Sequence, residues 1–169
     1  EKGYFDVRVD VREEEASQRA NAVNLIFNIA TEEKIKIAKI HFEGNEAISD
    51  RKLAKMMKDT KVKAHFLKAS KFIESDYETD KETLLTHYHN LGYRDAQIIQ
   101  DSVWRNQDSL LELSLTIQEG KQYYFGNITW KGNTIHTNEE LSRVLGIHKG
   151  EIYNEELLNT RLTFSIDGR

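Results

Sequence analysis

Cysteine and proline are both absent from this 169-residue chain. Without cysteine the chain can form no disulfide, bind no zinc through thiolates and carry no cysteine nucleophile. The compartment stays open, because cysteine-free chains are found both in an oxidising periplasm and in a cytosol. No apolar run is long enough to cross a bilayer. The composition, 38% hydrophobic and 31% charged, is that of a folded globular chain of one medium domain or two small ones.

A strong positive charge is also missing, since the net charge is −4. Nucleic-acid binding normally needs a basic stripe with interleaved aromatic residues. The nearest candidate is Lys58–Lys71, which holds five lysines and no arginine. We interpret this segment as a solvated basic loop, and we expect no nucleic-acid partner.

No cluster of residues with catalytic or metal-binding spacing stands out. His87 and His89 are two positions apart on an expected helix and therefore point to different sides. The acidic runs Glu13–Glu15 and Glu32–Glu33 are expected to be solvated turns. The remaining histidines have no clustered acidic or histidine partners in the sequence: His41, His65, His136 and His148. We therefore predict no catalytic residue, metal or cofactor, and a protein that is not an enzyme.

What the chain does contain is an internal repeat. Gly3-Tyr4-Phe5-Asp6-Val7 resembles Gly92-Tyr93-Arg94-Asp95-Ala96, 89 positions later. Ile40–Asn45 resembles Ile128–Asn133 at a spacing of 88 positions, and Leu53 matches Leu141 at the same spacing. The period has the size of a small domain, so the chain is expected to hold the tail of one module, one complete module and the front of a third.

Alternation of apolar and polar residues predicts the strands of the complete module. A first strand is expected over Ile35–Phe42 and is followed by a turn at Gly44-Asn45. Ala96–Arg105 and Leu110–Gln118 are expected to form a hairpin around a turn at residues 106–109. The same hairpin pattern is visible near the N-terminus, over residues 5–12 and 23–29.

Helix signals lie between the first strand and the hairpin. Ser49 is the expected N-cap of one helix, with Ile48 and Leu53 spaced as a hydrophobic staple. A second helix is expected from Ser75 or Asp76, ending at Gly92 in a left-handed conformation. In the next repeat Thr137 and Glu140 have the spacing of a capping box, Gly146 ends the helix, and Gly132-Asn133 repeats the turn.

The order is therefore strand, helix, helix, strand, strand. It predicts an α+β fold in which two helices cover one face of a three-stranded mixed sheet and the other face is solvated.

This order, with Ile40–Asn45 in the first strand and turn and Tyr88–Ala96 at the end of the second helix, resembles the POTRA (polypeptide-transport-associated) domain. Ser70–Glu74 is similar to the same position in proteins of the BamA type, and tandem repetition points to these barrel-assembly proteins. The expected divisions are 1–31 for the hairpin of a preceding module, 34–119 for a complete module and 122–169 for part of a following one. Because Glu1-Lys2-Gly3-Tyr4 does not look like the start of a protein, we expect the chain to be part of a larger one.

The resemblance implies a periplasmic scaffold at the bacterial outer membrane that receives unfolded outer-membrane proteins and docks accessory lipoproteins. Contact with the membrane would then come only through a barrel domain that this chain lacks. The alternative is a structural or docking component of another secretion, translocation or division complex that uses the same module. An unrelated enzyme is a third possibility, for which the sequence offers no set of residues.

Two features suggest how such a scaffold would work. If the return strand is central, as the resemblance implies, the first hairpin strand is an edge to which an extended peptide can add. The competing interpretation is that Asp101, Arg105 and the polar turn only protect this edge. The candidate residues are Gln97, Ile98, Ile99, Gln100, Asp101, Ser102, Val103, Trp104 and Arg105. The short joints at 30–34 and 118–122 would also limit motion between modules, and residues 123–125 pack either between modules or in the third module's core.

Overall fold

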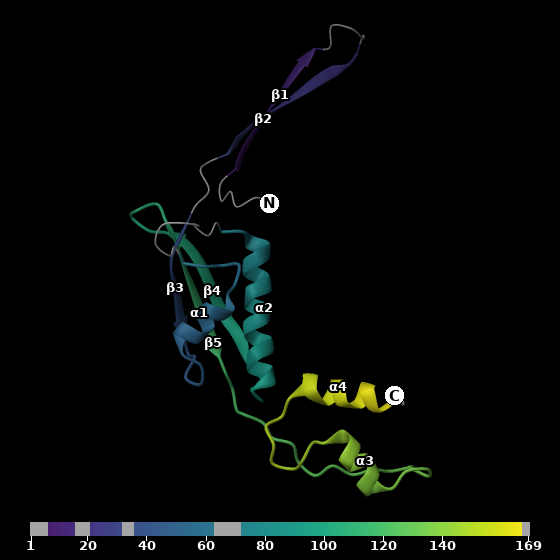
Figure 1. Cartoon of the computed structure of the whole chain (residues 1–169). Coiled ribbons are helices and arrows are strands. Elements are labelled where there is room, and N and C mark those ends of the chain that lie inside the picture. The colour runs from purple at the N-terminus through teal and green to yellow at the C-terminus, as the bar shows by residue number, and fades with distance from the viewer. Residues whose placement is uncertain (1–6, 16–20, 32–35, 63–71, 167–169) are drawn as a thin grey trace.

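The structure is a computed structural model that describes residues 7–15, 21–31, 36–62 and 72–166. The elements follow the chain in three groups, shown in Figure 1. A hairpin of β1 (Val7–Glu15) and β2 (Val23–Thr31) comes first. A central module follows, and α3 (Asn138–Leu145) and α4 (Glu155–Ile166) lie at the far end.

The central module contains all five expected elements. They are β3 (Ile37–Glu43), α1 (Asp50–Met56), α2 (Glu74–Asn90), β4 (Gln97–Arg105) and β5 (Leu111–Gln118). The strands form one sheet in the order β3-β5-β4, in which β5 is parallel to β3 and antiparallel to β4. The prediction of a three-stranded mixed sheet with a central return strand is confirmed.

The core lies between the sheet and the two helices. Alternate residues of β5 are fully buried while their neighbours are half-buried, as expected for a strand with one covered face. Leu53 of α1 and Leu84 of α2 are fully buried in the same cluster. The α+β prediction, with helices on one face and a more polar opposite face, is confirmed for this module.

Details at the helix ends differ from expectation. The second helix starts at Glu74, one or two residues before the predicted start. Ser49 occupies the N-cap of α1 with an extended backbone, but its side chain makes no capping hydrogen bond. The prediction of a Ser49 side-chain cap is therefore wrong. The neighbouring turn is instead held by the amide of Asn45, which donates to the carboxylate of Asp50 over 2.8 Å.

The N-terminal hairpin is regular and antiparallel, with Val11 opposite Phe27. The acidic run Glu13–Glu15 lies in β1, so the prediction of a solvated turn there is wrong; pairing with residues 23–25 of β2 keeps these residues in the strand. Glu32–Glu33 lie outside the described residues, as does most of the lysine-rich segment. In the described part of the chain, no helix combines the length and apolar character needed to cross a membrane.

The third unit has its two helices but not the expected first strand. Residues 125–131 form no strand, and the nearest pairing is a single bridge between Tyr124 and Ile152. The match of Ile128–Asn133 to the first strand and turn of the complete module implies a strand through Ile128 and Trp130, and this expectation is wrong. Phe125 still exchanges backbone hydrogen bonds with Gly150 and Glu151. A strand needs a partner along its length, and no described strand pairs with residues 126–131. A small core forms nonetheless from Phe125, Leu145 and Ile147.

The aromatic residues after the second joint divide between the two expected roles. Tyr123 packs between modules, because its N–H donates to the carbonyl of Gly92 over 2.8 Å. Phe125 is buried in the third unit's core. Tyr124 is 55% exposed and bonds through its hydroxyl to the side chain of Gln122.

Candidate functional site

The predicted peptide-binding segment, Gln97–Arg105, is β4 and forms one edge of the sheet. Its register against β5 shifts between Ile98 and Gln100, so Ile99 has no partner residue on β5. Such a bulge interrupts an edge and increases its twist. The regular part of the edge therefore runs from Gln100 to Arg105. Binding to this strand stays a prediction.

The backbone groups at the hairpin end show which way the strand faces. The N–H of Asn106 donates to the carbonyl of Leu110 over 2.8 Å, across the hairpin. The N–H of the next residue, Leu111, donates in the opposite direction to the carbonyl of Lys36 over 2.9 Å. The bonds of an antiparallel pair alternate in this way along its length.

This alternation determines which backbone N–H and C=O groups of β4 bond to β5 and which face away from it. Ser102 and Trp104 lie opposite Ser114 and Glu112, at the positions whose backbone groups bond to β5. Asp101 and Val103 lie between them, so their N–H and C=O groups face away from β5. The regular part of the edge therefore presents backbone groups of Asp101 and Val103 to an incoming strand.

On the open face of the sheet an aromatic residue sits beside a polar pair. Trp104 is 40% exposed and stacks on the ring of His41, with centroids 5.8 Å apart. His41 Nε2 lies 2.9 Å from Glu112 Oε2, and Asn106 donates to the other carboxylate oxygen over 3.1 Å. The bonds from His41 and then Asn106 hold the pKa of Glu112 below its ordinary value.

On the helix face the edge strand is tied to α2. The ammonium group of Lys81 lies 2.7 Å from Asp101 Oδ2 and 2.8 Å from Glu78 Oε1. Burial acts to lower the pKa of Lys81, but the hydrogen bonds to the two carboxylates outweigh it and raise the pKa. The side chain of Asp101 is thus held on α2 while its backbone faces the edge.

The first Gly-Asn turn, Gly44-Asn45, has a structural role. Gly44 has φ +76°, and a Cβ there would collide with the carbonyl oxygen of Ile117. The amide of Asn45 donates to the carbonyl of Ile48 and to the carboxylate of Asp50, both over 2.8 Å. Glycine is required by the close approach and asparagine by the two bonds.

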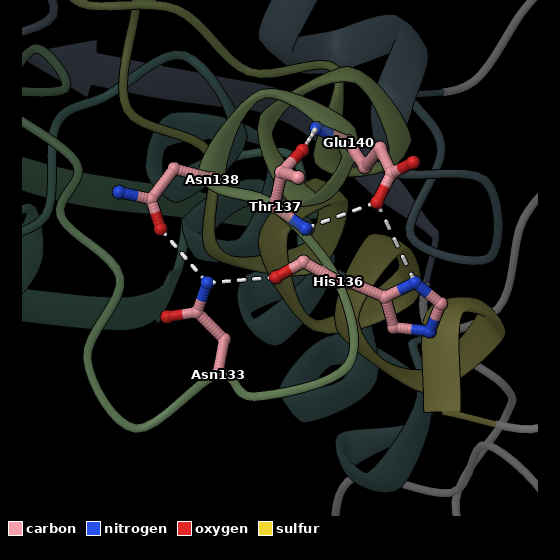
Figure 2. A network of polar contacts seen from close by, with 5 residues as sticks. All are labelled: Asn133, His136, Thr137, Asn138 and Glu140. Carbon is pink, nitrogen blue, oxygen red and sulfur yellow. Dashed lines mark hydrogen bonds and ion pairs between the residues drawn. The ribbon is translucent and has the colours of Figure 1, made fainter.

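The second Gly-Asn turn repeats this arrangement 88 positions later, as Figure 2 shows. Gly132 has φ +82°. The amide of Asn133 donates to the carbonyl of His136 over 2.8 Å and to the side chain of Asn138 over 2.9 Å. The same amide therefore bridges the same two positions in both turns, which accounts for the repeat without any ligand.

The end of α2 is shaped by the Gly-Tyr pair. Gly92 is left-handed, at φ +86°, as predicted. Its N–H donates to the carbonyl of His89, and the N–H of Tyr93 donates to the carbonyl of Tyr88, each over 3.0 Å. These two bonds define a Schellman ending. The ring of Tyr93 then packs edge-on against Tyr88, with centroids 6.0 Å apart.

A family model for "POTRA: Surface antigen variable number repeat" matches residues 35–120 and again residues 123–163. The chain belongs to the POTRA family. The first match covers the complete module and the second covers the unit of α3 and α4, so the recognition of tandem POTRA modules of the BamA type is confirmed.

Relatives of these POTRA modules include two assembly factors. The chain is 31% identical over 159 residues to the "Putative outer membrane protein assembly factor" of Treponema pallidum, covering 91% of the chain and 18% of that protein. It is 28% identical over 146 residues to "Outer membrane protein assembly factor BamA" of Neisseria meningitidis, covering 84% of the chain and 18% of that protein. The chain thus spans less than a fifth of the length of either relative.

Among solved structures, the POTRA3-5 segment of Haemophilus influenzae BamA has the same fold. It aligns with a TM-score of 0.58 at 24% identity, covering 78% of this chain and 53% of that one.

Within the described ranges, these POTRA modules contain no group of three or more histidine, cysteine, aspartate or glutamate side chains that could hold a metal. His87 and His89 are half-buried on α2, and His89 Nε2 lies 3.3 Å from the carbonyl oxygen of Ala96. The candidate site is the backbone edge of β4.

Sequence reasoning missed two contacts at this edge. His41 and Glu112 are 71 positions apart, so the spacing of residues along the sequence does not predict their contact. Strand alternation does place both on the open face, and this signal was available. Lys81 was missed because its partner Asp101 lies on another element.

Proposed function

We propose that this chain is a periplasmic polypeptide-binding segment of the outer-membrane β-barrel assembly machinery. In this role it receives unfolded outer-membrane proteins and docks accessory lipoproteins of the assembly complex. Two full-length relatives are named as outer-membrane assembly factors, and this chain corresponds to a POTRA-containing part of them. The proposal places it on the periplasmic side of the outer membrane and assigns it a binding role rather than a catalytic one.

The observation that carries the proposal is the outward-facing backbone of β4. An extended segment that pairs there would bond to the N–H and C=O groups of Asp101 and Val103 and extend the sheet by one strand. Main-chain bonds demand little of the client's sequence, which suits a factor that handles many different proteins. The bulge at Ile99 confines regular pairing to the stretch from Gln100 to Arg105.

Edge protection is the competing role of the same residues. The bulge and the charged pair of Asp101 with Lys81 are both devices that discourage pairing between edges. They act on the first part of the strand and on one face of it. The backbone of Val103 keeps its outward direction, so protection and selective strand addition are compatible.

The test is a pair of proline substitutions on adjacent residues. Proline at Val103 removes an outward N–H and leaves the bonds between β4 and β5 in place, whereas proline at Ser102 removes an N–H that bonds to β5. The probe is a ten-residue peptide with the alternating pattern of a barrel strand and a photoreactive residue at its centre. We expect wild type and Val103→Ala to crosslink through β4 and Val103→Pro to lose the crosslink while remaining folded.

Ser102→Pro should instead lose stability, and this loss identifies the direction of the ladder. Crosslinking of folded Val103→Pro at the level of Val103→Ala would refute strand addition at this edge. Crosslinks that map to β3, the other edge of the sheet, would place the binding strand elsewhere.

A second candidate role is that of a structural component in another secretion, translocation or division complex. Tandem matches to the family model and relatives named as assembly factors favour the first role. Depletion of the full-length protein discriminates between them: loss of barrel proteins from the outer membrane supports the first, and a defect confined to secretion or division supports the second.

A further inference from the structure

The contacts between the complete module and the following unit converge on one short segment at the end of α2, residues 90–95. We propose that this segment is a clamp that fixes the orientation of the following POTRA unit, with Arg94 and Asp95 as its positioning residues. The clamp gives the arm one rigid joint, and it does so independently of any client that binds to β4.

The backbone of Gly92 contacts the following unit directly. Its carbonyl accepts the N–H of Tyr123 over 2.8 Å. A Cβ at this position would lie 2.8 Å from Cγ2 of Ile152 and 2.8 Å from the carbonyl oxygen of Tyr123, too close for either atom. Glycine is therefore needed here twice, once to end α2 and once to let the next unit approach.

The side chains of Arg94 and Asp95 hold two segments of the following unit. The guanidinium carbon of Arg94 lies 5.0 Å from the ring centroid of Tyr153 and 5.8 Å from that of Tyr123, within the range of cation–π attraction. The hydroxyl of Tyr123 donates to Asp95 Oδ2 over 2.7 Å. Tyr123 and Tyr153 are 30 positions apart, and their own backbones pair through the N–H of Tyr153 and the carbonyl of Tyr123 over 2.9 Å.

Side chains of the following unit also complete the C-terminus of α2. The last carbonyls of a helix have no partner within it. The carbonyl of Leu91 accepts the amide of Gln122 over 2.9 Å, and the carbonyl of Asn90 accepts the amide of Asn154 over 3.2 Å. The side chain of Asn90 donates to Glu156 Oε2 over 2.6 Å. Rotation of the following unit would therefore break bonds that belong to the helix end itself.

The same set of residues is not repeated at the earlier joint. The internal repeat aligns Phe5 with Arg94 and Ile35 with Tyr123. Phenylalanine supplies no cation and isoleucine no hydroxyl, so the sequence cannot form these two contacts there. The clamp is consequently a property of one joint and not of the repeat as such.

The test uses a pair of spin labels on the whole 169-residue chain. Because the chain has no cysteine, Ser75→Cys on α2 and Asn159→Cys on α4 give two unique labelling sites. We expect a single narrow distance distribution in the otherwise wild-type chain. Arg94→Ala and Asp95→Ala should each widen this distribution, and the double variant should widen it most. Arg94→Lys should widen it less than Arg94→Ala, because lysine keeps the cation.

Arg143→Ala, an exposed change on α3 away from the joint, is the matched control and should leave the distribution unchanged. Unaltered circular dichroism in each variant separates loosening of the joint from unfolding. A broad distribution in the wild-type background would overturn the proposal, because the joint would then not be fixed. A narrow distribution in the folded Arg94→Ala/Asp95→Ala variant would overturn it as well, because other contacts would hold the joint.

Discussion

The carboxylate of Asp80, in the middle of α2, accepts the backbone N–H of Thr60 over 2.7 Å, although the two residues are 20 positions apart. The same carboxylate accepts the N–H groups of Lys58 and Asp59 over 3.0 and 3.2 Å. Asp80 and Thr60 are 3% and 2% exposed. One buried side chain thus supplies the acceptors for the chain that leaves α1.

Asp80→Ala should destabilise the complete module, because it leaves buried N–H groups without an acceptor. A lost bond to a charged acceptor costs about 2–3 kcal/mol. Asp80→Asn should cost less, since an amide keeps one acceptor oxygen. Urea unfolding followed by Trp104 fluorescence, in a Trp130→Phe background, measures the change in the complete module. Glu82→Gln, exposed on the same helix, is the control and should change stability little; an equal loss in Asp80→Ala and Glu82→Gln would contradict the role of Asp80.

Tyr77 offers the opposite case, a buried hydroxyl without a hydrogen-bond partner among the described residues. Burial, together with the nearby charges of Asp101 and Glu78, raises the pKa of this hydroxyl well above its ordinary range. Tyr77→Phe keeps the ring and removes the unpaired oxygen, so we expect the same stability or a gain of up to about 1 kcal/mol. The same urea titration measures it, with Leu84→Ala as a control that should lose about 2–5 kcal/mol through a cavity. A marked loss in Tyr77→Phe would show that the hydroxyl has a partner.

Stability at acidic pH should depend on Glu112. Its pKa is depressed by His41 and Asn106, so the ionised form is favoured in the folded state. The ionised Glu112 therefore stabilises the folded state in full above the ordinary pKa of a glutamate. This stabilisation is lost as the pH falls through the lower pKa of the folded state. The stability difference between wild type and Glu112→Gln should be largest near neutral pH and shrink on acidification. Unfolding midpoints measured from pH 7 to pH 3 test this, and parallel curves for the two proteins would contradict it.

Much of the fold could be predicted from the sequence because its signals are local or periodic. Alternation along 111–117 identified the strand β5, and the glycine at position 92 identified the end of α2. The capping box of Thr137 and Glu140 is present as its spacing indicated. Each of these features depends on residues within one turn or one strand, so no knowledge of the tertiary structure was needed.

The errors have a different physical origin. The expected strand through Ile128 failed because a strand exists only with a partner, and periodicity cannot show whether the partner is there. Contacts of Asp80 with Thr60, of His41 with Glu112 and of Tyr123 with Asp95 join residues that are 20 to 71 positions apart. The edge strand itself was identified, but its bulge at Ile99 depends on the register with β5, which the sequence of β4 alone does not encode.

The two helix starts provide a final prediction. Thr137 and Asn138 begin α3 as Ser49 and Asp50 begin α1, yet of the two N-cap residues only Thr137 makes the side-chain cap. Its hydroxyl accepts the N–H of Glu140 over 3.2 Å, and the carboxylate of Glu140 accepts the N–H of Thr137 over 3.0 Å. Thr137→Ala should therefore cost α3 about 1 kcal/mol, whereas Ser49→Ala should leave α1 nearly unchanged. Amide hydrogen exchange measures both, since a loss of this size in local opening speeds exchange about five-fold. Equal acceleration in the two helices would contradict the assignment, because it would mean that serine at position 49 caps α1 in solution as threonine at position 137 caps α3.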